Sequence, residues 1–125
     1  MDNNIYYLLL DDEVVSELPG VHSVKTIKEA VMTMKKNDVK IVFLDGVLTG
    51  QETGLDFLKI MTAYKLKPVE IIIVTGHPKL RIDMLKYTEG NSYFDDIKVS
   101  TMDKMIIKYL DSHIDYSSIL SYHPK

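Results

Sequence analysis

The chain has 125 residues, 46% of them hydrophobic, which is enough for one domain with a substantial buried core. A formal net charge of -3 excludes a bulk-charge attraction to duplex DNA or anionic membranes. The lack of cysteine excludes a disulfide framework, and the lack of a long apolar run excludes a transmembrane segment. The first residues also lack the basic region of a signal peptide, so we expect a cytoplasmic protein.

Apolar runs of strand length alternate with segments in which apolar residues recur every three or four positions. The strand runs are continuous and rich in β-branched residues, which is typical of strands buried on both faces of a parallel sheet. In chain order we predict strand 5–10, strand 21–25, helix 27–34, strand 39–44, helix 57–64, strand 69–74, helix 78–87, strand 93–98 and helix 102–109.

This alternation predicts an α/β domain with right-handed crossovers, helices on both faces of the sheet, five strands and four or five helices. Only about ten residues, including Pro19 and Gly20, separate the first two strands, so we predict a shortened first crossover. No linker or repeat divides the chain. We therefore expect a single domain over residues 1–125, with a core of about 5–112 and a C-terminal tail at 113–125.

A polar residue closes each of four predicted strands, and ligands bind outside the carboxyl ends of strands in an open parallel sheet. These residues are Asp11 and Asp12, then Asp45, Thr75 and Lys98. Three carboxylates brought together repel one another, and a hard cation such as Mg²⁺ relieves that repulsion with oxygen ligands. The sequence therefore predicts a Mg²⁺ site.

With the cation in place, Asp45 could attack phosphorus, the Thr75 hydroxyl could donate to one phosphoryl oxygen, and the Lys98 ammonium could neutralise another. Each residue also has a structural interpretation. The paired aspartates could cap the next segment, Thr75 could belong to a turn, and Lys98 could be an exposed strand-end lysine.

The blocks LLLDDE, IVFLD, IIIVTGH and DIKVS resemble the signature of response-regulator receiver domains, the CheY-like superfamily. The resemblance implies a flavodoxin-like, doubly wound parallel sheet with strand order 2-1-3-4-5. It also implies site roles: Asp45 as phosphate acceptor, Asp11 and Asp12 as Mg²⁺ ligands with the backbone carbonyl of Val47, Thr75 as the switch hydroxyl and Lys98 as the phosphate-pairing lysine.

A smaller family, the receiver-like domains proposed to process cyclic phosphates, is similar in LLDDE, VKTIKEAV and ETGLDFLKIM. In that family a His-Asp pair follows the acidic strand, and here Gly46 and Val47 stand there instead. The segment after the fourth predicted strand, residues 69–74, resembles the family pattern only at His77 and Pro78.

These residues and resemblances leave three alternative functions. The first is a stand-alone signalling domain that is phosphorylated on Asp45 by a histidine kinase or other phosphodonor and acts through an effector protein or a homodimer, with self-phosphorylation and dephosphorylation as its only catalysis. The second is a metal-dependent phosphoesterase acting on nucleotide or RNA cyclic phosphates. The third is a degenerate receiver that binds a protein partner independently of phosphorylation.

Overall fold

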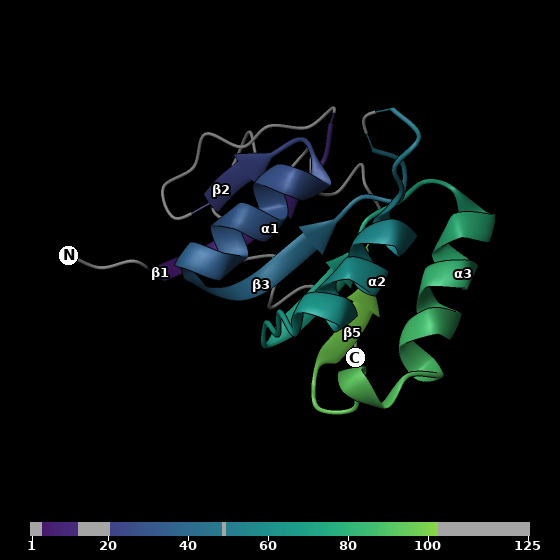
Figure 1. Ribbon diagram of the computed structural model, residues 1–125. Coiled ribbons are helices and arrows are strands. Elements are labelled where there is room, and N and C mark those ends of the chain that lie inside the picture. The colour runs from purple at the N-terminus through teal and green to yellow at the C-terminus, as the bar shows by residue number, and fades with distance from the viewer. Residues whose placement is uncertain (1–3, 13–20, 49, 103–125) are drawn as a thin grey trace.

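The structure is a computed structural model that describes residues 4–12, 21–48 and 50–102 (Figure 1). Its elements are β1 (Asn4–Leu10), β2 (Val21–Val24), α1 (Ile27–Lys36), β3 (Asp38–Leu44), α2 (Gly54–Tyr64), β4 (Glu70–Ile73), α3 (Pro78–Glu89), the 3₁₀ helix η1 (Ser92–Phe94) and β5 (Lys98–Thr101). The predicted first crossover, the helix after Met102 and the tail lie outside the described residues. In the described part, no helix has the length and apolar character needed to cross a bilayer.

All five strands are parallel, in the order β2-β1-β3-β4-β5. This confirms the predicted flavodoxin-like α/β topology. Leu10 of β1 pairs with both Val24 and Leu44, Leu44 pairs with Ile73, and Ile73 pairs with Thr101. The carboxyl ends of the strands therefore lie level along one edge of the sheet.

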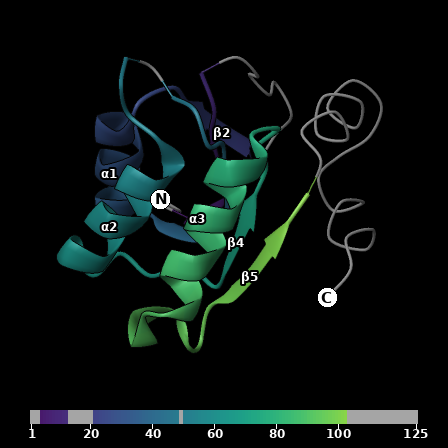
Figure 2. The ribbon, with the colours of Figure 1, turned by 90° about the vertical axis from the view of Figure 1, so that its right-hand side faces the viewer.

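Both faces of the central strands are buried, as their continuous apolar runs predict. On one face, α1, α2 and α3 pack against a core that includes Leu8, Val42 and Ile71 (Figure 2). On the other face, a second cluster includes Phe43 and Ile72, and no described helix contributes to it. The prediction of helices on both faces is thus confirmed for one face within the described residues.

Local hydrogen bonding fixes where the helices begin. Thr26 and Glu29 form a reciprocal capping box at the start of α1, and Thr53 and Asp56 form another at the start of α2. The backbone N–H of Lys25 is the main cause of a lowered pKa at Glu29. Hydrogen bonding to Glu29 therefore favours the folded state above the unfolded pKa of glutamate, and this stabilisation is lost as the pH falls through the lowered value.

One predicted strand is displaced along the chain. Residues 93–98 were expected to form it, but β5 begins only at Lys98. The Asn91 side chain accepts a hydrogen bond from the Tyr93 N–H at 3.0 Å, which starts η1, and the Phe94 ring packs edge-on against Tyr87 and Tyr93. This aromatic packing holds a turn where strand propensity alone favours extended backbone.

Candidate functional site: a carboxylate cluster at the carboxyl edge

The paired ends of β1 and β3 place two aspartates side by side. The Asp45 N–H donates to the Leu10 carbonyl at 3.0 Å, and the Asp11 N–H donates to the Val24 carbonyl at 3.1 Å. These two bonds continue the sheet one residue beyond the strands. The backbones of Asp11 and Asp45 are therefore fixed by the same ladder that builds the core, and Asp12 follows directly.

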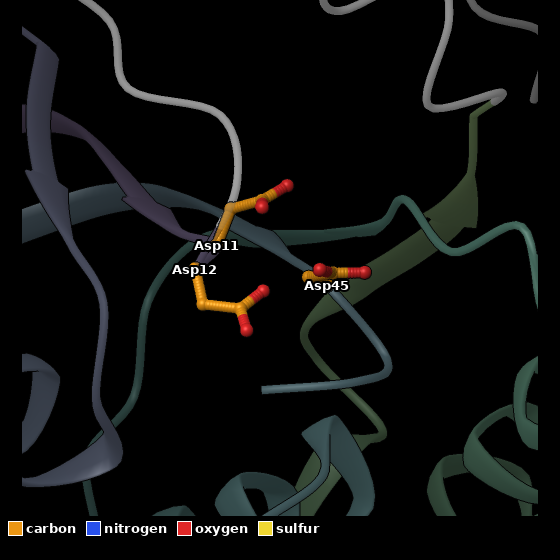
Figure 3. Close-up of side chains that lie close together, drawn as sticks. All are labelled: Asp11, Asp12 and Asp45. Carbon is orange, nitrogen blue, oxygen red and sulfur yellow. The ribbon is translucent and has the colours of Figure 1, made fainter. Parts of the chain in front are cut away.

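The structure brings Asp11, Asp12 and Asp45 together, as the sequence predicts (Figure 3). One carboxylate oxygen from each lies within 4.8 Å of the others. Asp11 is only 1% exposed and Asp45 only 2%, while Asp12 is half-buried. Two buried carboxylates and a third at their side form a strongly acidic site.

The donor set fits Mg²⁺. Carboxylate oxygens are the hard ligands that Mg²⁺ prefers, and one cation bound between three of them would offset their mutual repulsion. A zinc or copper site would favour histidine or cysteine ligands, and the cluster consists of aspartates alone. The residues present therefore suit a hard divalent cation.

The loop between β3 and α2 orients the Asp45 carboxylate. The Gly46 N–H donates to Asp45 Oδ1 at 2.7 Å, and the Gly46 carbonyl accepts from the Gly54 N–H at 2.7 Å. Between these glycines, Val47 pairs with Thr53 in an isolated antiparallel bridge. Val47 thus lies two residues from Asp45 in a closed loop, and its role as a backbone metal ligand stays a prediction.

Two glycines allow a close packing that side chains would prevent. A Cβ at position 46 would lie 2.5 Å from Thr75 Oγ1 and 2.9 Å from Leu80 Cδ2. A Cβ at position 54 would collide with the Asp45 carbonyl oxygen and lie 2.5 Å from Met84 Cε. The loop, the first turn of α2 and the end of β4 therefore converge on Asp45 only because neither position carries a side chain.

Thr75 lies at this site, as predicted. Thr75 lies just after β4, the strand that pairs with β3, and it is 2% exposed. Its hydroxyl oxygen accepts a hydrogen bond from the His77 N–H at 3.1 Å, and the same oxygen lies beside Gly46. A hydroxyl adjacent to the residue that follows Asp45 is placed to donate to an anion bound there.

Lys98 is not brought to the site, and the prediction that it lies there is wrong. It begins β5 and pairs with Glu70 at the start of β4, so it occupies the amino edge of the sheet. Four residues of strand, about 13 Å, separate it from the level of Asp45. Its ammonium lies 3.8 Å from Glu70 Oε2. The cause is the displaced β5, which places the buried Met102 at the carboxyl edge instead.

A different cation, which the sequence analysis did not single out, approaches the carboxyl edge. Arg81 Nη1 donates to the Thr75 carbonyl at 3.4 Å. Arg81 belongs to the first turn of α3, and its side chain is half-buried. The only signal in the sequence is a basic residue soon after the proline that starts this helix, which does not reveal where the guanidinium points.

A known protein family matches the part of the chain that contains the three aspartates. Residues 6–90, about two thirds of the chain, match the family described as the cyclic-phosphate processing receiver domain. The chain belongs to this family. No curated protein matches the chain. The family match includes Asp11, Asp12, Asp45 and Thr75 and ends before Lys98, so it covers the predicted site residues that the structure brings together.

We predict that Gly54→Ala lowers the free energy of unfolding by about 1–3 kcal/mol, because the new methyl group displaces α2 from the Asp45 backbone or forces Met84 aside. Urea unfolding measures this loss. Gly76→Ala is the matched control, since a Cβ there has no atom within 4 Å and should leave stability nearly unchanged. Equal stability of the Gly54 variant and wild type would contradict the close approach described here.

Proposed function

We propose that this receiver domain binds Mg²⁺ at Asp11, Asp12 and Asp45 and accepts a phosphoryl group on Asp45. The observation that supports the proposal is the convergence of the three carboxylates, with ligand oxygens within 4.8 Å of one another. Two further features suit the chemistry. Asp45 Oδ1 is oriented by the Gly46 N–H, and the Thr75 hydroxyl lies next to that glycine.

In the proposed reaction, a carboxylate oxygen of Asp45 forms a bond to phosphorus while the bond from phosphorus to the donor's leaving atom breaks, which is an oxygen in acetyl phosphate and an imidazole nitrogen in a phosphohistidine. With acetyl phosphate as donor, acetate leaves and an aspartyl phosphate remains. The Gly46 N–H holds the carboxylate in place, and Thr75 donates to a phosphoryl oxygen. Bound Mg²⁺ would supply positive charge that offsets the carboxylates and the incoming phosphoryl group.

As a signalling domain, the protein would receive its phosphoryl group from a histidine kinase or a small phosphodonor and act through an effector protein. The receiver family supports this type of partner. The described surface offers exposed apolar side chains for such a contact, including Ile82 on α3 at 49% exposure. The lack of cysteine is compatible with the reducing cytoplasm.

We predict that Asp45→Asn abolishes Mg²⁺-dependent labelling by acetyl phosphate, because the amide has no nucleophilic carboxylate oxygen. Intact-protein mass spectrometry detects the phosphorylated species. Asp38→Asn is the matched control, since this aspartate begins the same strand at its opposite end and pairs with Lys40. Labelling of wild type and Asp38→Asn but not of Asp45→Asn is expected, and equal labelling of all three would refute the acceptor assignment.

A second candidate function is hydrolysis of a cyclic phosphate ester at the same site. The family match favours it, and so does the position of Lys98, which removes the ammonium expected in an aspartyl-phosphate site. In this reaction water attacks phosphorus, one ring P–O bond breaks, and the released sugar hydroxyl takes a proton. The product is a phosphate monoester, and the carboxylate cluster would again hold the cation.

For this second function we predict that the wild-type protein converts a 2′,3′-cyclic nucleotide to a monophosphate in the presence of Mg²⁺. Asp12→Ala should slow the reaction about 100-fold or more through loss of a metal ligand, and Asp38→Ala should not slow it. Chromatography of the nucleotide products measures the rate. If neither labelling nor hydrolysis occurs and Asp45→Ala still binds a protein partner, the domain is a phosphorylation-independent binding module.

A further inference from the structure

We propose that Arg81 is the cationic group that binds phosphoryl oxygens at the carboxylate site, in the role that the sequence assigned to Lys98. This inference rests on the proposed phosphoryl chemistry and adds to it a residue that the sequence analysis did not single out. Its starting point is the hydrogen bond from Arg81 Nη1 to the Thr75 carbonyl, at 3.4 Å. That contact turns the guanidinium back from α3 toward the end of β4.

A short series of contacts connects this guanidinium to the acceptor. The Thr75 side chain lies beside Gly46, where an added Cβ would be 2.7 Å from the Thr75 Cβ. The Gly46 N–H in turn donates to Asp45 Oδ1 at 2.7 Å. A group bound to Asp45 and reaching Thr75 therefore comes close to the residue whose carbonyl already binds Arg81.

The charge of Arg81 is available to a ligand. Within residues 4–12, 21–48 and 50–102, Arg81 takes part in no ion pair, whereas neighbouring Lys79 pairs with Asp83 at 3.2 Å and Lys98 pairs with Glu70. A half-buried cation without a carboxylate partner gains most from an anion. Within the described residues, this unpaired guanidinium is therefore held at the backbone carbonyl of Thr75, the residue whose side-chain hydroxyl belongs to the site.

The chemistry of arginine suits this role. The guanidinium has five N–H donors in a planar fork, and the contact with Thr75 uses one of them. The remaining donors match the spacing of two phosphoryl oxygens, which a lysine ammonium binds only as a point charge. The ligand is therefore a phosphoryl group with at least two free oxygens, as found both in an aspartyl phosphate and in a cyclic phosphate diester.

The test measures three affinities of the full chain: for Mg²⁺ alone, for beryllofluoride with saturating Mg²⁺, and for a 2′,3′-cyclic nucleotide with saturating Mg²⁺. Arg81→Gln should weaken anion binding about 10- to 100-fold through loss of charge-assisted hydrogen bonds. Mg²⁺ affinity should change by less than about twofold because Asp11, Asp12 and Asp45 remain. Arg81→Lys should recover part of the anion affinity by restoring the charge.

Lys79→Gln is the matched control, because Lys79 lies in the same turn of α3, is 85% exposed and is paired with Asp83. It removes the same charge and should leave all three affinities unchanged. If Arg81→Gln lowers the affinity for beryllofluoride, Arg81 binds the phosphoryl group of an aspartyl phosphate. If it lowers the affinity for the cyclic nucleotide, Arg81 binds the phosphate of a free ester. Both results support the inference.

Two kinds of result would overturn it, and they differ from a failure of the proposed function. If wild type and Arg81→Gln bind both anions equally, Arg81 has no binding role, although the site itself stands. If Arg81→Gln weakens the binding of Mg²⁺ and of the anions and also lowers the urea concentration at the unfolding midpoint, the role of Arg81 is structural. If the wild type binds neither Mg²⁺ nor either anion, the proposed function and this inference both fail.

Discussion

The main physical constraint on the site is the mutual repulsion of three carboxylates that the sheet brings together. At separations within 4.8 Å, each pair of ionised oxygens repels by at least about 3 kcal/mol at an effective dielectric constant of 20. The protein places two of these groups in positions with almost no solvent exposure. An arrangement of this kind is stabilised by a bound cation, so the same geometry that opposes folding in isolation suits the Mg²⁺ ion that we propose for this site.

The rest of the structure maintains this geometry. Parallel pairing of β1 with β3 sets the level of Asp11 and Asp45, and the hydrogen bond between Gly46 and Gly54 closes the loop that follows. Close packing at both glycines then brings Thr75 and the start of α2 against the backbone of Asp45 and the loop that follows it. The core and the site are therefore built from one set of contacts. A change in packing at the carboxyl edge also changes the candidate site.

Much of this architecture is predictable from sequence because its signals are local. The buried runs of β3 and β4, the capping box of Thr26 and Glu29 and the proline at the start of α3 each specify an element without reference to distant residues. The three aspartates are predictable too, since parallel strands share a carboxyl edge. The prediction that Lys98 lies at the site was wrong because packing of the Phe94 ring places β5 further along the chain than its sequence pattern suggests. The position of the Arg81 guanidinium depends on a contact with Thr75 that spacing does not encode.

A crystal structure of the protein grown with Mn²⁺, as an anomalous scatterer in place of Mg²⁺, tests the central claim most directly. The account predicts one strong anomalous peak bonded to carboxylate oxygens of Asp11, Asp12 and Asp45, and loss of that peak when excess Mg²⁺ competes. The absence of a peak among these side chains at millimolar Mn²⁺, or a metal bound only elsewhere, would contradict it.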